Sequence, residues 1–205
     1  MIKLYDYWRS SASYRVRIAL GLANLEWETE IVNLLDGDHK SDTHLARNPQ
    51  GLVPALEIDG LMMTQSVAVI EYLDETRSLG LLPQAPADRA KVRALAFAVA
   101  MEIHPVCNLN VVKFAVSQSN ENIETKQWMQ HFITKGLVAL ENMLDGSKYC
   151  FGETVTLADI CLMPQLYNAE RWGVDLTEMP KIRAVSAELA KLPAFDQAHP
   201  DQSPH

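Results

Sequence analysis

Residues 53–64, VPALEIDGLMMT, carry the most informative pattern in the chain. Two short runs with strand composition flank Asp59-Gly60, a dipeptide typical of the turn in a two-residue β-hairpin. A helix is expected directly afterwards, over residues 65–77, because apolar residues recur there about one turn apart. The sequence therefore predicts two antiparallel strands followed by a helix.

A second pattern lies upstream of this hairpin. Residues 2–7 (IKLYDY) have strand composition, residues 14–24 have helical spacing, and residues 27–34 (WETEIVNL) alternate like a half-buried strand. A helix that joins two strands makes them parallel, whereas a tight hairpin makes them antiparallel. The order β-α-β and then β-β-α predicts an α/β, thioredoxin-like domain with a mixed four-stranded sheet over residues 1–80, in which residues 36–42 form a polar loop.

Beyond this first domain the strand patterns stop. Two prolines and a glycine mark a linker, given the bounds 81–86, and residues 87–205 are predicted to form an all-helical domain whose tail, 193–205, is extended or frayed. Thr156, with Asp159 three residues later, is a variant of the capping box that starts a buried helix. The predicted helices cover residues 88–116, 122–145, 156–172 and 180–191.

The composition narrows the range of functions. The net charge of −8 over 205 residues argues against a nucleic-acid partner, which needs a basic face. No leader with a cleavage site is apparent, and the longest apolar run, 94–101, is too short to cross a bilayer, so a cytoplasmic protein is expected. Cys107, Cys150 and Cys161 form no close pair and are expected to be buried, reduced thiols.

Residues 7–20, YWRSSASYRVRIAL, place Ser10 and Ser11 at a helix start where small redox proteins often carry a cysteine pair. A serine there commonly caps the helix. The same hydroxyls, with the free amides of the first turn, can also stabilise an anion, and the spacing leaves both interpretations open. Arg15 and Arg17 lie two residues apart and cannot share a helical face, so we expect Arg15 at the site and Arg17 paired elsewhere.

Val53 and Pro54 begin the hairpin, and Gln65 and Ser66 begin the helix after it. An X-Pro bond is usually trans, but in a thioredoxin-like unit this one is expected to be cis, exposing the Val53 backbone to an extended peptide. Ser66 is either an N-cap or part of an anion site for the carboxylate of that peptide. The predicted ligand is a short peptide.

The histidines do not suggest a metal site. His39 and His44 are five residues apart, which does not place them on one helical face, and no carboxylate or cysteine cluster completes a site. His104 precedes Pro105 inside a helical pattern, which predicts a kink in that helix. No metal is therefore expected.

Six motifs follow one another along the chain: RSSASYRVRIAL (9–20), NPQGLVPALEIDG (48–60), QSVAVIEYL (65–73), LLPQ (81–84), TLADICLMPQ (156–165) and NAERWGVDL (168–176). In this order they resemble the zeta-class glutathione transferases, the family that includes maleylacetoacetate isomerase and the maleylpyruvate isomerases. The resemblance covers nearly the whole chain. It implies a glutathione transferase fold and a homodimer, with glutathione as cofactor. The implied activity is glutathione-dependent cis-trans isomerisation of a dianionic 4-oxo-2-enoate, maleylacetoacetate to fumarylacetoacetate, in tyrosine and phenylalanine breakdown.

The resemblance also implies a role for individual residues. Ser10, with Ser11 close behind, donates a hydroxyl to the glutathione thiolate, while Arg9 and Arg171 recognise the carboxylates of the substrate. For each arginine, the alternative is a surface salt bridge. The cysteinyl part of glutathione pairs with Val53, its γ-glutamyl end lies at Gln65 and Ser66, and its glycine end meets His39. The remaining residues of the implied glutathione site are Ala12, Ser13, Tyr14, Arg15, Pro54, His104, Asn108, Leu109 and Asn110.

The sequence departs from the family at Ala12, where members often carry cysteine. Isomerisation does not require that thiol, whereas reductive dehalogenation by relatives uses it to resolve a mixed disulfide with glutathione. Ala12 therefore disfavours the processing of α-haloacids. Two further alternatives stay open: isomerisation of maleylpyruvate in an aromatic-acid pathway such as gentisate degradation, and a non-catalytic interaction module.

Overall fold

The computed structural model describes residues 1–120 and 122–204 and divides them into two compact units. The first contains residues 1–80 together with the segment from Lys191 onward, and the second contains Leu81–Ala190. The predicted division assigned every residue after 86 to the helical domain, so the C-terminal segment differs from that prediction. The last residue of the predicted domain, His205, lies outside the described residues.

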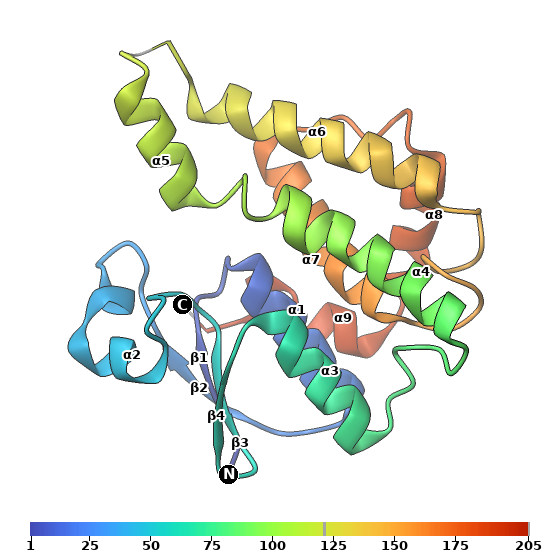
Figure 1. Cartoon of the computed structure of the whole chain (residues 1–205), viewed down its shortest axis with the longest axis horizontal. Coiled ribbons are helices and arrows are strands. Elements are labelled where there is room, and N and C mark those ends of the chain that lie inside the picture. The colour runs from blue at the N-terminus through green and yellow to red at the C-terminus, as the bar shows by residue number, and fades with distance from the viewer. Residues whose placement is uncertain (121, 205) are drawn as a thin grey trace. The chain divides into compact units, whose positions relative to one another are not determined.

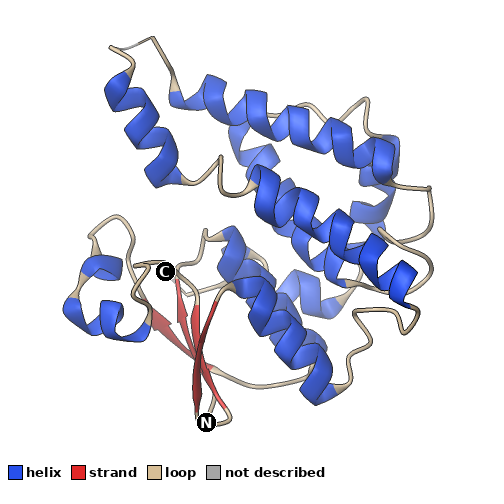
Figure 2. Cartoon of the chain, in the orientation of Figure 1, coloured by secondary structure: helices blue, strands red, loops and turns tan. Residues whose placement is uncertain are grey.

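A four-stranded mixed sheet forms the centre of the first unit, as predicted (Figures 1 and 2). The strands lie in the order β2-β1-β3-β4; β1 runs parallel to β2 and antiparallel to β3, and β3 runs antiparallel to β4. Asp59 and Gly60 both have positive φ, 54° and 77°, as a type I′ hairpin turn requires. The strands are β1 (Lys3–Asp6), β2 (Glu28–Ile31), β3 (Ala55–Ile58) and β4 (Leu61–Thr64).

Two helices, α1 (Ser11–Leu22) and α3 (Ser66–Arg77), pack against each other in this unit and lie side by side in Figure 1. Their apolar side chains, Ile18 and Leu20 on α1 and Ile70 on α3 among them, are fully buried in the core. The residues after β2 differ from the predicted loop, because a short 3₁₀ helix (Asp38–Lys40) and α2 (Asp42–Arg47) form there. Ser41 starts α2 by accepting a hydrogen bond from the His44 amide.

The prediction of an extended or frayed tail was wrong. Residues 193–202 form α9 (Pro193–Gln197) and a 3₁₀ turn (Pro200–Gln202), and α9 packs on α1. Phe195 is buried, and its carbonyl accepts a hydrogen bond from the Tyr14 hydroxyl at 3.3 Å. Burial of this aromatic ring offsets the entropy lost in ordering a polar, proline-rich segment.

Helices make up the described part of the second unit, which contains no strand. The predicted helix over 88–116 is interrupted, because its chain leaves the helical path at His104–Asn108 and Asn108 then caps α5. Pro105, which lacks an N–H, ends the helix there and does more than kink it. The helices are α4 (Pro86–Phe97), a π-helical segment (Ala98–Ile103), α5 (Leu109–Gln118), α6 (Thr125–Met143), α7 (Leu157–Trp172) and α8 (Pro180–Leu189).

The start of α7 confirms the predicted capping box. The buried Asp159 carboxylate accepts hydrogen bonds from the Thr156 amide at 2.8 Å, the Thr156 hydroxyl at 2.7 Å and the Cys150 amide at 2.8 Å. Burial raises the pKa of Asp159 above its usual range, although these hydrogen bonds act in the opposite direction. Across the described ranges, no helix combines the length and the apolar character needed to span a bilayer.

Candidate functional site

The start of α1 is the first part of the candidate site. Ser10 occupies the N-cap, where its Oγ accepts a hydrogen bond from the Ser13 amide at 3.2 Å. Ser11 follows as the first helical residue; it is half-buried, and its hydroxyl forms no hydrogen bond with any described residue. The first turn carries no acidic residue. Because the first amides of a helix lack partners within the helix, the N–H groups of Ser11 and Ala12 remain suited to an anion.

The start of α3 is the second part. Gln65, not Ser66, occupies the cap position, and it does so with φ 68° and ψ 104° and without a capping side chain. The interpretation of Ser66 as an N-cap was therefore wrong, since Ser66 is already the first residue of the helix. A positive φ is uncommon for glutamine, and such conformations persist where the surrounding structure holds them, often at ligand sites.

One arginine joins the two helix starts. The guanidinium of Arg15, which is only 2% exposed, reaches from α1 to α3, where its Nη1 donates to Ser66 Oγ at 3.4 Å. A buried cation beside two helix N-termini favours anionic ligands at that place. The sequence analysis expected Arg15 at the site, but its pairing with Ser66 had no signal, because the two residues are 51 positions apart.

Gln50 is a further residue that sequence reasoning missed. Its side-chain oxygen accepts a hydrogen bond from the Gln65 side-chain amide at 2.6 Å, so the two glutamines lie together at the start of α3. The motif NPQG, directly before the hairpin, was the available signal. A polar side chain in a loop between Asn48 and Gly51 gives no indication of its partner, however.

Only some of the residues from Ser10 to Arg15 lie at the start of α1, where the first helix amides lack partners within the helix. The side chains of Ser13 and Tyr14 are buried in the packing of α1, and the Tyr14 hydroxyl bonds to the C-terminal segment. Ala12 is half-buried in the first turn. The structure therefore presents Ser10, Ser11 and the backbone of Ala12 at this position, whereas the side chains of Ser13 and Tyr14 are buried behind them.

The backbone before β3 is the third part. The Val53-Pro54 peptide bond is cis, as predicted. Leu52, the residue before Val53, is held in place by two side chains. Its carbonyl accepts a hydrogen bond from Asn48 Nδ2 at 2.8 Å and lies 2.9 Å from His44 Nε2. Val53 packs in a cluster with Tyr5, Tyr7, Val32 and Ala55.

His39 is buried within the short 3₁₀ helix. Among the residues that the structure describes, no group of three or more His, Cys, Asp or Glu side chains could hold a metal ion.

The second unit carries the other predicted residues. His104 follows the π-helical segment, and its amide donates to the Val99 carbonyl at 3.0 Å. Asn108 caps α5 by accepting a hydrogen bond from the Asn110 amide at 2.9 Å, with Leu109 between them. These four residues thus lie where the chain passes from the π-helical segment into α5.

Both arginines predicted to bind carboxylates lie against a neighbouring tryptophan. The guanidinium carbon of Arg9 is 4.0 Å from the Trp8 ring centroid in the first unit, and that of Arg171 is 5.2 Å from the Trp172 ring in the second. Both side chains are exposed, and neither forms a salt bridge with any residue that the structure describes. A guanidinium that stacks on a ring keeps its N–H edge available for a carboxylate.

The cysteines do not supply a nucleophile. Burial raises the pKa of the Cys107 thiol to about 11. Burial, with the nearby Asp159 carboxylate, raises the pKa of Cys150 well above its ordinary value, and Cys161 is fully buried. Because the thiolate is the reactive form, Cys107 and Cys150 are poorly suited to act as nucleophiles at neutral pH. Any thiolate chemistry at this site depends on a thiol that the ligand brings.

Comparison with known proteins identifies two family regions. Residues 1–75 match "Glutathione S-transferase, N-terminal domain", and residues 107–197 match "Glutathione S-transferase, C-terminal domain". Among relatives, maleylacetoacetate isomerase of Rhizobium meliloti is 54% identical over 98% of this chain and 96% of its own length. The enzyme of the same name from Mus musculus is 45% identical over 98% and 93%.

Solved structures agree in fold over the full chain. A holo structure of maleyl pyruvate isomerase, described as a bacterial zeta-class glutathione S-transferase, aligns with a TM-score of 0.93 and 40% identity, covering 98% of each chain. Maleylacetoacetate isomerase from Anaeromyxobacter dehalogenans, with glutathione bound in its active site, aligns with a TM-score of 0.89 and 39% identity, covering 100% of this chain and 97% of that one.

Proposed function

The chain belongs to the glutathione S-transferase family, and from that membership we propose that it is a glutathione-dependent isomerase that converts maleylacetoacetate to fumarylacetoacetate. One observation carries the proposal: the protein places hydroxyls and helix-start amides, but no reactive thiol of its own, at the start of α1. Such a site stabilises a thiolate that arrives with the ligand. The full-length similarity to curated maleylacetoacetate isomerases then favours this substrate.

The residues of the first unit fit glutathione. The Val53 backbone pairs with the cysteinyl portion, and Pro54 shapes that stretch of chain. The γ-glutamyl carboxylate lies at Gln65 and Ser66, where the start of α3 and the buried Arg15 guanidinium favour a negative charge. His39 binds the glycine end of glutathione. In the second unit, His104 and the turn Asn108–Asn110 complete the set.

When bound, glutathione supplies a thiolate that adds to the double bond, permits rotation about the resulting single bond, and departs. The chain keeps that sulfur ionised. Ser10 donates a hydrogen bond from its hydroxyl to the sulfur while its oxygen accepts one from the Ser13 amide, and an accepted hydrogen bond makes a hydroxyl a better donor. Ser11, whose hydroxyl forms no other hydrogen bond, is the second donor. The positive end of the α1 dipole adds to both.

Arg9 and Arg171 bind the carboxylates of the dianionic substrate. A guanidinium binds a carboxylate through two parallel N–H bonds, and stacking on Trp8 or Trp172 limits the conformational freedom that binding would remove. The absence of a salt bridge to any described residue argues against the alternative of a surface ion pair for either side chain.

Maleylpyruvate is the second candidate substrate, favoured by the TM-score of 0.93 to the maleyl pyruvate isomerase structure. Assays of both substrates with and without glutathione test the proposal. We expect isomerisation only with glutathione, and a higher kcat/KM for maleylacetoacetate. S-methylglutathione is the control, since it occupies the site without a free thiol and should support no turnover. Isomerisation that proceeds without glutathione, or no isomerisation of either substrate, contradicts the proposal.

Under the same proposal the protein is a cytoplasmic homodimer. Three free, buried thiols fit a reducing compartment. Leu61 and Met62 are exposed on the edge strand β4, and natural proteins usually cover an apolar sheet edge. Light scattering coupled to size-exclusion chromatography measures the mass, for which we expect twice 23.0 kDa.

A further inference from the structure

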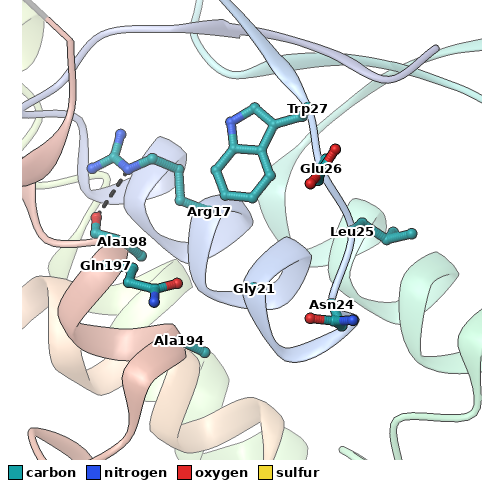
Figure 3. Close-up of a pocket in the computed structure, with 9 residues that line it drawn as sticks. All are labelled: Arg17, Gly21, Asn24, Leu25, Glu26, Trp27, Ala194, Gln197 and Ala198. Carbon is teal, nitrogen blue, oxygen red and sulfur yellow. Dashed lines mark hydrogen bonds between the residues drawn. The ribbon is translucent and has the colours of Figure 1, made fainter.

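Arg17 is the most extensively bonded buried cation of the first unit, and the proposed mechanism leaves it without a role. Its side chain is 2% exposed. Nη1 donates to both carboxylate oxygens of Asp6, at 3.0 and 2.7 Å, Nη2 donates to the Trp8 carbonyl at 3.1 Å, and Nε donates to the Ala198 carbonyl at 3.0 Å. Figure 3 shows the guanidinium and the bond to Ala198 at the edge of a pocket of about 500 Å³.

The three partners of Arg17 come from three segments. Asp6 is the last residue of β1, Trp8 lies in the turn between β1 and α1, and Ala198 ends α9. Arg17 itself lies in the middle of α1. A single planar guanidinium therefore connects the strand, the turn and the C-terminal segment to the helix whose start carries the proposed thiolate donors.

The turn that Arg17 holds leads directly into Ser10. The Ser10 amide donates to the Tyr7 carbonyl at 2.8 Å and closes the turn over residues 7–10, and the Trp8 carbonyl bonded to Arg17 lies within it. The position of the Ser10 hydroxyl depends on the path of this turn. Anchoring the turn on the same helix thus fixes Ser10 relative to the amides of Ser11 and Ala12.

The folding stability of the protein gives only a weak reason for burying Arg17 together with Asp6. Burying an ion pair removes two charges from water, and well-packed apolar residues in place of such pairs are often as stable or more so. The fork of donors on arginine, in contrast, reaches several acceptors in fixed directions, which neither lysine nor an apolar side chain can do. The Asp6 carboxylate also balances the charge of Arg17, so its effect on a ligand passes through geometry.

We infer that Arg17 is a positioning residue for the isomerisation, which acts by holding the turn over residues 7–10 so that the hydroxyl of Ser10 meets the thiolate of bound glutathione. The inference rests on the proposed function. It predicts that loss of Arg17 affects the affinity for glutathione much less than the pKa of the bound thiol and kcat. Glutathione should bind almost normally, because Val53, Gln65 and Ser66 hold most of it, while the thiolate should be less well stabilised and the chemical step slower.

The test compares Arg17→Lys with Arg47→Lys at saturating glutathione. Arg47 is a matched control in the same unit. Its Nη1 lies 3.0 Å from Glu30 Oε1, its guanidinium carbon lies 4.1 Å from the Tyr5 ring centroid, and its side chain bonds to no described residue of the turn over 7–10. Thiolate absorbance against pH gives the pKa of the bound thiol. For Arg17→Lys we expect that pKa to rise by about one unit and kcat to fall about tenfold, with the glutathione Kd changed less than about threefold. Arg47→Lys should match the wild type.

Asp6→Asn is the second variant, which keeps the size of Asp6 and one acceptor for Arg17 and decides the matter if Arg17→Lys does not fold. If the wild type lowers the pKa of the bound thiol but folded Arg17→Lys and Asp6→Asn do so equally well, the inference is overturned and the proposed function stands. If the wild type itself leaves the pKa of the bound thiol at the free value near 8.5, the proposed function fails and the inference fails with it.

Discussion

The starts of α1 and α3 in the first unit differ in kind from the start of α7 in the second. At α7 a buried carboxylate, Asp159, closes the helix by accepting three hydrogen bonds. At α1 and α3 the first turn holds no acidic residue, and only a serine or a strained glutamine stands at the cap. An acid of the chain occupies the start of α7, whereas the starts of α1 and α3 leave room for an anion from outside, so the first serves folding and the other two can serve binding.

Removal of the Asp159 carboxylate at the start of α7 should have the largest effect, and that effect is on stability. Asp159→Ala leaves three buried donors without an acceptor, and each such group costs about 1–3 kcal/mol, so we expect the free energy of unfolding to fall by about 3–5 kcal/mol. Urea unfolding measures the loss. Turnover of the protein that remains folded at low temperature should be unchanged, and a stability close to that of the wild type would refute the assignment of α7 as a closed helix start.

Converting an open helix start into a closed one is the next test. Ala12→Asp puts a carboxylate into the first turn of α1, where it competes with the thiolate for the same amides. We expect kcat/KM to fall by about 10- to 100-fold from the added like charge, while the helix dipole raises stability by about 0.3–1 kcal/mol. Ala12→Asn is the neutral control of the same size and should keep most of the activity. Equal kinetics for both variants would show that α1 does not hold the anion.

The two serines should separate capping from catalysis. Ser10→Ala removes the N-cap bond to Ser13, so stability should fall by about 1 kcal/mol, and the pKa of bound glutathione should rise by about 1–2 units as one hydrogen bond to a charged sulfur is lost. Ser11→Ala should raise that pKa by less and leave stability within about 0.5 kcal/mol. Thiolate absorbance and thermal unfolding report the two effects. A titration unshifted in both variants removes the hydroxyls from the mechanism.

The smallest expected effect is the pH dependence of folding stability that Asp159 contributes at the start of α7. Burial raises the pKa of Asp159 in the folded state, so the folded protein binds this proton more readily than the unfolded chain does. Stability from this group is therefore greatest below the unfolded pKa of about 3.9 and declines as the pH rises through the folded value. Asp159→Asn, which cannot titrate, should lack that contribution when unfolding is followed against pH. An identical slope in both proteins would argue against a raised pKa.

Features that depend on a few neighbouring residues were predicted correctly. The positive φ angles of Asp59 and Gly60 are those that an Asp-Gly hairpin turn needs, and the pairing of Thr156 with Asp159 spans three residues. Ser10 was recognised as a possible cap because capping is also local. In each case the residues that interact are close enough in the chain for residue type and spacing to specify the hydrogen bonds.

The missed features involve distant partners or competing local signals. Pro105 and the Asn108 cap ended a helix whose apolar periodicity continued past them. The tail after Pro193 has the composition of a frayed end, yet Phe195 and Ala198 lie against α1. Composition alone cannot reveal a surface on which a polar segment will pack, because the free energy that orders it comes from the other side of the contact.

Local chemistry in the sequence was sufficient for the order of the four strands with α1 and α3, the hairpin, the capped start of α7 and the serines at the start of α1. It was not sufficient for the environment of the arginines. Arg15 and Arg17 lie two residues apart on one helix, but their partners Ser66 and Ala198 are 51 and 181 residues away. The acceptors that each guanidinium reaches follow from packing, because burial favours hydrogen bonds to whichever acceptors the folded chain brings close.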